Sequence, residues 1–192
     1  GMRRANNQDS KSVVLANAEA TWPRRGHVFM VADGMGAHAA GELASKLAVD
    51  NVPHTYHKLV ELPPAAAIEK AVVDANSLIH TRGKGTIDFQ GMGTTSSTLV
   101  LLPQGALVAH VGDSRVYRLR GTTLEQLTFD HSLVWEMLAA GEAEEKAVHE
   151  FVPKNVITRS LGPHPRVEVD LEGPFPIELG DIFLLCSDGL TG

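Results

Sequence analysis

The sequence predicts an α+β domain in which antiparallel strands are combined with two long helices. Short apolar runs rich in β-branched residues are bounded by turn residues, and this pattern is typical of strands. Glycines separate several of these runs at close intervals, which favours hairpins between antiparallel neighbours. The two long helical segments follow one another after the first strands, so helices and strands do not alternate as they do in a βαβ fold.

Seven strands are expected in chain order. Each is an apolar run with turn residues at its ends. They cover residues 13–18, 27–32, 97–102, 106–111, 115–119, 167–171 and 182–186.

Three segments are predicted to be helical. Residues 39–56 and 63–79 place apolar side chains at helical spacing, and the second segment opens with Pro-Pro, which suits the first turn of a helix. A shorter helix over residues 133–140 ends at Gly141, a residue suited to a left-handed C-cap. The charged segment 142–150 is expected to form a second short helix or a flap.

Composition narrows the class of protein. The chain has 192 residues, 43% of them hydrophobic, and a formal net charge of −6, so we expect one packed domain over residues 1–192 and no non-specific binding of nucleic acid. No apolar run approaches the ~20 residues of a membrane span. The single cysteine, Cys186, excludes an internal disulfide and is expected to be a buried packing residue. These features predict a soluble, cytoplasmic domain without a membrane contact.

Three of the predicted strands end in aspartate. Asp33 and Asp188 are each followed by glycine, and Asp113 follows Gly112. If these strands are neighbours, three carboxylates converge at one end of the core, and their mutual repulsion requires a cation. Carboxylate oxygens and the backbone carbonyl exposed at such a turn favour Mg²⁺ or Mn²⁺ over Zn²⁺. One Asp-Gly pair is ordinary turn chemistry, but three such endings favour a metal site.

Arg4 adds a second feature, because it lies five residues before Asp9. A guanidinium group beside an acidic metal cluster suits an anionic oxygen ligand, since its planar fork matches phosphate. The equal alternative is a solvated arginine near the end of the chain. A metal pair together with an arginine indicates phosphoryl chemistry. For His110 and His131, the histidines nearest these residues, a structural role is expected.

Several different short motifs follow one another along the chain. Together, and in this order, they resemble the motifs of the metal-dependent Ser/Thr protein phosphatases of type 2C in their bacterial form. Each motif alone is weak, but the ordered set is specific and extends from Arg4 to the end of the chain. The motifs are Arg4-Ala-Asn-Asn-Gln-Asp-Ser10, Asp33-Gly-Met-Gly-Ala-His-Ala-Ala-Gly-Glu42, Gly91-Met-Gly-Thr-Thr95, Gly112-Asp-Ser-Arg115 with Tyr117, Asp130-His-Ser132, Val156-Ile-Thr-Arg-Ser-Leu-Gly162 and Leu185-Cys-Ser-Asp-Gly-Leu190.

The resemblance implies a four-layer αββα fold, a sandwich of two antiparallel β-sheets flanked by helices, with a dinuclear metal site at one edge. It implies two Mn²⁺ or Mg²⁺ ions bridged by Asp33, with the Gly34 carbonyl and Asp188 as further ligands. Asp113 would bind the third, looser ion of bacterial members. Residues 132–155 would form a flap beside the site.

The resemblance also implies an activity, the hydrolysis of phosphoserine and phosphothreonine in substrates of a Ser/Thr kinase. A hydroxide held between the ions would attack phosphorus in line, while Asp9 acts through metal-bound water and Arg4 takes the substrate phosphate. Some relatives carry a histidine two residues after the bridging aspartate, where this chain has Met35. The proton for the leaving oxygen would therefore come from water or from another group.

The end of the chain departs from the family pattern. Family domains continue to a Gly-x-Asp-Asn motif that ligates metal, whereas the one Asp-Asn pair here, Asp50-Asn51, lies in a predicted helix. We therefore expect the domain to lack one ligating carboxylate at its C-terminus and the strand that precedes the Arg4 motif. Unpaired sheet edges would then favour a homodimer through strand pairing. The alternative function is a catalytically impaired, phosphatase-like binding or regulatory module.

Overall fold

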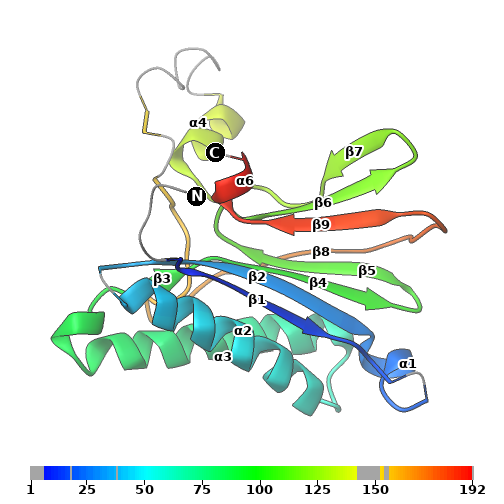
Figure 1. The fold of residues 1–192 in the computed structure, drawn as a ribbon, viewed down its shortest axis with the longest axis horizontal. Helices are drawn as coiled ribbons and strands as arrows, with labels where there is room; N and C mark the ends of the chain where they lie inside the picture. The colour runs from blue at the N-terminus through cyan, green and yellow to red at the C-terminus, as the bar shows by residue number, and fades with distance from the viewer. Residues whose placement is uncertain (1–6, 18, 38, 142–151, 154–155, 192) are drawn as a thin grey trace.

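The fold is a sandwich of two antiparallel sheets with two long helices packed on one of them (Figure 1). A computed structural model describes residues 7–17, 19–37, 39–141, 152–153 and 156–191. The helices cover the outer face of the larger sheet, and the smaller sheet covers its inner face (Figure 1). The described part of the chain thus contains the two central sheets and one outer helical layer.

The larger sheet has the strand order β1-β2-β4-β5-β8, and the short strand β3 pairs with the end of β2. The smaller sheet has the order β7-β6-β9, and all pairs in both sheets are antiparallel. The strands are β1 (Asp9–Val14), β2 (His27–Met35), β3 (Gly93–Thr94), β4 (Ser96–Leu102), β5 (Gly105–Val111), β6 (Arg115–Arg120), β7 (Thr123–Gln126), β8 (Asp170–Phe175) and β9 (Ile182–Cys186).

Two helices, α2 (Ala40–Lys58) and α3 (Pro64–Lys84), make the helical layer. Their small and branched side chains, such as Ala48 and Ile68, are fully buried against the sheet. The shorter helices are α1 (Trp22–Arg25), η1 (Ile87–Phe89), α4 (Leu133–Ala140) and α6 (Asp188–Thr191). None of the helices in the described part of the chain is long and apolar enough to cross a membrane.

The alternation of side chains along β2 divides the core in two. Val28 and Met30 are buried in the cluster between the larger sheet and the helices. Phe29, between them in sequence, packs in the second cluster, where Leu99 meets Val116 of the smaller sheet. Since successive side chains of a strand point to opposite faces, every second residue of β2 faces the smaller sheet.

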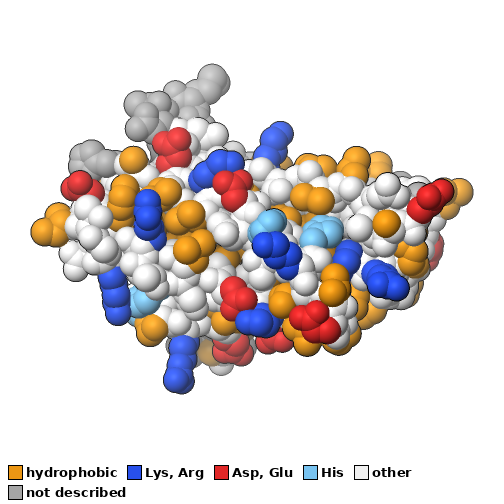
Figure 2. Space-filling view, turned by 90° about the horizontal axis from the view of Figure 1, so that it is seen from below, with side chains coloured by type: hydrophobic (Ala, Val, Ile, Leu, Met, Phe, Trp, Pro, Cys, Tyr) orange, Lys and Arg blue, Asp and Glu red, His pale blue; other side chains and the backbone are white. Residues whose placement is uncertain are grey.

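The outer face of α2 and α3 carries acidic and basic side chains side by side (Figure 2). Two i, i+4 ion pairs contribute to this pattern, Lys46–Asp50 and Lys70–Asp74. Over the described residues of this face, no extended basic tract of the kind that binds nucleic acid is present.

Most of the predicted elements are found within one or two residues of their expected bounds. The helix over 133–140 is α4, and its C-cap Gly141 is left-handed with φ of 69°. The strand expected at 13–18 is wrong in position, because β1 covers Asp9–Val14 and the chain then turns where Thr21 N–H donates to Asn17 O. The strand expected at 167–171 is likewise wrong, because pairing with β5 places β8 at Asp170–Phe175.

Candidate active site

Asp9 and Asp33 lie directly opposite each other on β1 and β2. Opposite residues of an antiparallel pair project to the same face of a sheet, so the two carboxylates share one side. Asp33 is on the same face of β2 as Phe29, which packs toward the smaller sheet. Like charges placed in this way repel each other, so this pair is unfavourable for the sheet by itself.

The prediction that the second strand stops at Asp33 is wrong, because β2 continues to Met35. The strand pairs with β4 as far as Val31 and with β3 from Gly34 onward. Gly34 is tightly enclosed, since a Cβ atom at this position would lie 2.0 Å from Gly41 O. Asp33 therefore lies in regular strand geometry at the point where β2 changes its pairing partner from β4 to β3.

Hydrogen bonds from the β3–β4 region fix the backbone of Asp33. Its N–H donates to Thr95 Oγ1 at 2.9 Å, and its carbonyl accepts from Thr95 N–H at 2.9 Å and from Thr94 Oγ1 at 3.1 Å. Thr94 and Thr95 are both fully buried. The two threonines of the Gly91–Thr95 motif are thus the immediate support of the central carboxylate.

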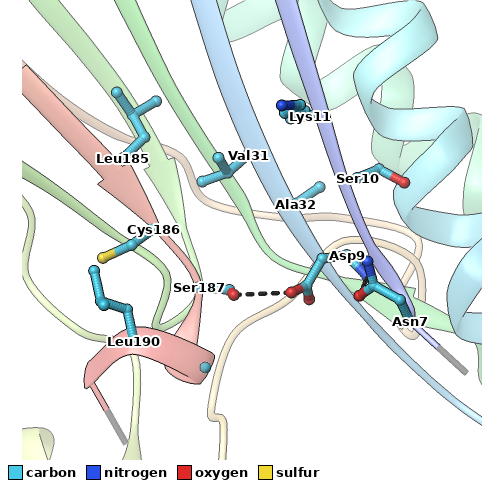
Figure 3. A pocket seen from close by; sticks show the side chains of 11 residues that line it. Asn7, Asp9, Ser10, Lys11, Val31, Ala32, Leu185, Cys186, Ser187 and Leu190 are labelled. Atoms are coloured by element: carbon cyan, nitrogen blue, oxygen red, sulfur yellow. Dashed lines mark hydrogen bonds between the residues drawn. The ribbon is translucent and has the colours of Figure 1, made fainter. Parts of the chain in front are cut away.

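Asp188 reaches the same place from the smaller sheet. Strand β9 ends at Cys186, and Asp188 is the first residue of α6. Between them, Ser187 donates a hydrogen bond from Oγ to Asp9 Oδ2 at 3.0 Å (Figure 3). The condition of three neighbouring strands is not met, because β9 lies in the other sheet, and Asp188 meets Asp9 and Asp33 across the sandwich.

Asp113 follows β5 at a turn that packs against the support of Asp33. Gly112 has φ of +111°, and a Cβ atom there would lie 2.6 Å from Thr95 Cγ2. Strands β2 and β5 are separated by β4 in the sheet, and Thr95 links this turn to the backbone of Asp33, with which it exchanges hydrogen bonds. Only glycine satisfies both the backbone angle and the close approach at this position.

The electrostatics link these carboxyl groups to one another. Burial, the charges of Asp9 and Asp188 and hydrogen bonds with both together raise the pKa of Asp33 to about 8. Burial and, to a smaller extent, the charges of Asp188 and Asp130 raise the pKa of Asp113 to about 6. Each carboxylate therefore opposes the ionisation of the next, and a bound cation would reverse this effect.

This donor set fits a hard divalent cation by its chemistry. Carboxylate and carbonyl oxygens are the ligands that Mg²⁺ and Mn²⁺ prefer. Within the described residues, no three acidic, histidine or cysteine side chains are gathered closely enough to hold an ion as they stand. The observation that indicates a cation here is therefore the opposition of Asp9 and Asp33 across β1 and β2, with Asp188 close enough to raise the pKa of Asp33.

A cavity of about 480 Å³ opens beside Asp9, between β1 and β2 on one side and β9 with α6 on the other (Figure 3). Asp9 and Ser187 contribute its polar wall, and Val31, Leu185 and Leu190 contribute apolar wall. Of the carboxylate cluster, Asp9 lines this cavity, and the neighbouring Ser187 joins it there.

Some of the predicted site lies outside the described residues. Arg4 is among them. So are residues 142–151 and 154–155 of the predicted flap at 132–155, which include the whole charged segment 142–150. At the base of that flap, Ser132 forms a β-bridge with Ile157, and Leu133 N–H donates to Val156 O at 2.9 Å. Residues 132–133 and 156–157, which flank the undescribed part, therefore lie side by side.

Asp170 is a polar residue near the site that sequence reasoning missed. It accepts hydrogen bonds from His131 at 2.8 Å and from Arg159 at 2.7 Å. His131 and His110 are buried and hydrogen-bonded, as expected of structural residues, and burial lowers the pKa of His110 to about 4. Asp170 carries no signal in the sequence, since its strand pairs with β5 only through long-range contacts.

Comparison with known proteins places this geometry in context. A family model described as Protein phosphatase 2C matches residues 3–192. The serine/threonine phosphatase stp of Listeria welshimeri is 40% identical over 168 residues, which cover 85% of this chain and 66% of that protein. The chain thus spans slightly less than two thirds of the length of this curated relative.

Solved structures are similar over the whole described fold. The serine/threonine phosphatase PstP/Ppp of Mycobacterium tuberculosis is 36% identical with a TM-score of 0.79, over 98% of this chain and 74% of that one. A structure of the catalytic domain of PstP in complex with two manganese ions is 34% identical with a TM-score of 0.75, over 100% of this chain and 75% of that one. The prediction of two antiparallel sheets with flanking helices is confirmed by this similarity.

Proposed function

Since the chain belongs to the protein phosphatase 2C family, we propose that it hydrolyses phosphoserine and phosphothreonine in proteins with Mn²⁺ or Mg²⁺ as cofactor. The observation that carries the proposal is the meeting of Asp9, Asp33 and Asp188 across two sheets. Burial and the charges of Asp9 and Asp188 raise the pKa of Asp33 there. The similar PstP catalytic domain was solved with two manganese ions, which supports a metal at such a site. The relatives are named phosphatases, so a catalytically impaired binding module is not favoured.

We assign the metal-holding residues as Asp33, which would bridge two ions, with the Gly34 carbonyl and Asp188 as further ligands. Asp113, beside Thr95, would hold a third ion. Divalent ions bound there would supply positive charge toward the phosphate group and the attacking water. The close contact of Gly34 with Gly41 supports the assignment of its carbonyl, because it restricts the backbone at this point.

The remaining roles fall to residues around the carboxylates. Asp9, held by Ser187, would accept a hydrogen bond from the attacking water and orient it. Arg4 would bind the phosphate oxygens through its guanidinium fork. The leaving seryl or threonyl oxygen needs a proton, and solvent in the open cavity beside Asp9 is the source we propose, because Met35 has no proton to give.

The substrates we propose are phosphoproteins made by a Ser/Thr kinase. The compartment we propose is the cytoplasm, because such kinases use ATP there. Residues 1–192 are assigned to one phosphatase domain with a flap at 132–155 beside the site.

A homodimer is proposed through the edge strands β1 and β8 or β7 and β9, which have no second partner among the described residues. A monomeric mass in sedimentation equilibrium at micromolar concentration would contradict the dimer.

The test of the activity is phosphate release from a phosphothreonine peptide with and without Mn²⁺. Wild type should release phosphate only with metal, and Asp33→Asn should reduce the rate at least about a hundredfold because the central ligand loses its charge. Asp88→Asn, an exposed carboxylate away from the cluster, is the matched control and should retain the rate. Metal-independent release, or an active Asp33→Asn variant, would contradict the proposal.

A further inference from the structure

We propose that His131 is a positioning residue, whose ring holds the Gly112–Asp113 turn for metal binding and ties it to the segment that leads into α4. The inference rests on the proposed function, because Asp113 binds an ion only within that function. His131 is 2% exposed and its ring bonds the backbone of Gly112, next to Asp113, so its effect on metal would pass through the turn.

The hydrogen bonds of the ring define its tautomer. Gly112 N–H donates to His131 Nδ1 at 2.9 Å, and since a backbone N–H can only donate, Nδ1 must be unprotonated. The proton is therefore on Nε2, which donates to Asp170 Oδ2 at 2.8 Å. The ring thus bridges two segments and uses both of its nitrogens in defined roles.

The backbone of His131 strengthens the same connection. Its N–H donates to Gly112 O at 2.8 Å, so Gly112 is held by both its N–H and its carbonyl. The carbonyl of His131 accepts from Thr158 N–H at 3.0 Å, three residues beyond the predicted flap. One residue therefore joins the turn before Asp113 to the segment that follows the predicted flap at 132–155.

Gly112 is also confined from the opposite side. Thr95 lies so close that a Cβ atom at Gly112 would be 2.6 Å from Thr95 Cγ2, and Thr95 Oγ1 accepts the N–H of Asp33. The turn is therefore clamped between the support of Asp33 and the ring of His131. The position of Asp113 relative to Asp33 depends on both sides of this clamp.

Asp170 keeps the ring in place. Burial acts to raise the pKa of Asp170, but hydrogen bonds and charge from His131 and Arg159 outweigh burial and lower it, so the carboxylate stays ionised as an acceptor. A carboxylate on the outer nitrogen of a histidine fixes both the tautomer and the orientation of the ring.

Two substitutions separate the two roles of the ring. In His131→Asn the amide oxygen takes the place of Nδ1 and can still accept from Gly112, whereas the link to Asp170 is lost. In His131→Gln the amide nitrogen takes the place of Nε2 and can still donate to Asp170, whereas Gly112 loses its acceptor. A residue that only fills space and stabilises the fold would show no such difference in metal affinity.

The experiment is a Mn²⁺ titration of the metal-free chain, followed by the electron paramagnetic resonance signal of free Mn²⁺. We expect His131→Gln to weaken the loosest Mn²⁺ site about tenfold and to leave the tighter sites unchanged, since residues that orient a metal ligand have effects of this size. His131→Asn should stay within about threefold of wild type at every site. His80→Gln, which alters a half-buried histidine bound to Gly162 O, is the control and should bind like wild type.

If His131→Gln does not fold, Asp170→Ala on the edge strand β8 replaces it, and about threefold weakening of the loosest site is then expected because the ring loses its outer partner. Equal affinities in the folded variants and wild type would overturn the inference and leave the proposed function intact. Equal losses in His131→Asn and His131→Gln would also overturn it. A wild-type chain that binds no Mn²⁺ would instead contradict the proposed function itself.

Discussion

In the metal-free protein, Asp33→Asn should increase the free energy of unfolding at alkaline pH and leave it nearly unchanged at pH 4. Burial and the charges of Asp9 and Asp188 raise the pKa of Asp33 from 3.8 to about 8. The folded state therefore holds a proton on Asp33 that the unfolded state releases at much lower pH. The resulting stability is fully present below pH 3.8 and is lost as the pH rises to about 8.

The size of the effect follows from that change in pKa. From 3.8 to about 8, it corresponds to roughly 6 kcal/mol at about 1.4 kcal/mol per pH unit. Asp33 is only partly buried, and water and salt screen its neighbours, so about 2 kcal/mol is the expected gain for Asn at pH 9. The asparagine cannot ionise and therefore avoids the repulsion.

The assay is urea unfolding in the presence of EDTA, followed by far-ultraviolet circular dichroism at pH 4 and pH 9. The difference between wild type and Asp33→Asn isolates the contribution of this one carboxyl group, since the other groups titrate in both proteins. Asp88→Asn should show no comparable gain at pH 9. Equal stabilities of wild type and Asp33→Asn at pH 9 would refute the view that burial and the neighbouring carboxylates disfavour an ionised Asp33 in the folded state.

Three further predictions concern the surroundings of the cluster. Ser187→Ala removes the 3.0 Å hydrogen bond to Asp9 and should lower kcat about fivefold, as expected for about 1 kcal/mol, whereas an unchanged kcat would show that Asp9 needs no such support. Asp130→Asn weakens the buried ion pair with Arg115 and should lower the free energy of unfolding by about 3 kcal/mol in urea denaturation, against under about 0.5 kcal/mol for Asp50→Asn in the exposed pair with Lys46. In Gly112→Ala the new Cβ atom would lie 2.6 Å from Thr95 Cγ2, so the free energy of unfolding should fall by at least about 2 kcal/mol in thermal unfolding. Gly121→Ala, where the space is open, is the control, and a smaller loss of stability in Gly112→Ala than in Gly121→Ala would contradict the clamp.

The sequence predicted the elements that are governed by local pattern. Strand β9 and helix α4 were found at their expected bounds, because apolar runs and a glycine C-cap define them locally. Strand β1 was misplaced because its first residues, Asp9 to Ser12, are polar, and pairing with β2 makes them a strand. Strand β3 has only two residues and exists because β2 exchanges one partner for another.

The candidate site was predicted as a set of residues and not as an arrangement. The aspartates were identified from their places after apolar runs, but whether these strands are neighbours stayed a condition of the prediction. Strand β9 belongs to the smaller sheet, and no local pattern states which sheet a strand joins. Asp170 and its partners His131 and Arg159 are distant in sequence and meet only through the folded sheet.

The location of the cluster explains how one fold can tolerate it. Asp9 and Asp33 belong to the larger sheet and Asp188 follows the smaller one, so neither sheet carries the whole repulsion before the two pack together. The inter-sheet core, which includes Leu99 and Val116, opposes that repulsion once the sandwich closes. A cation that relieves it should therefore also tighten the contact between the sheets, and metal affinity and sheet packing should change together in variants of either.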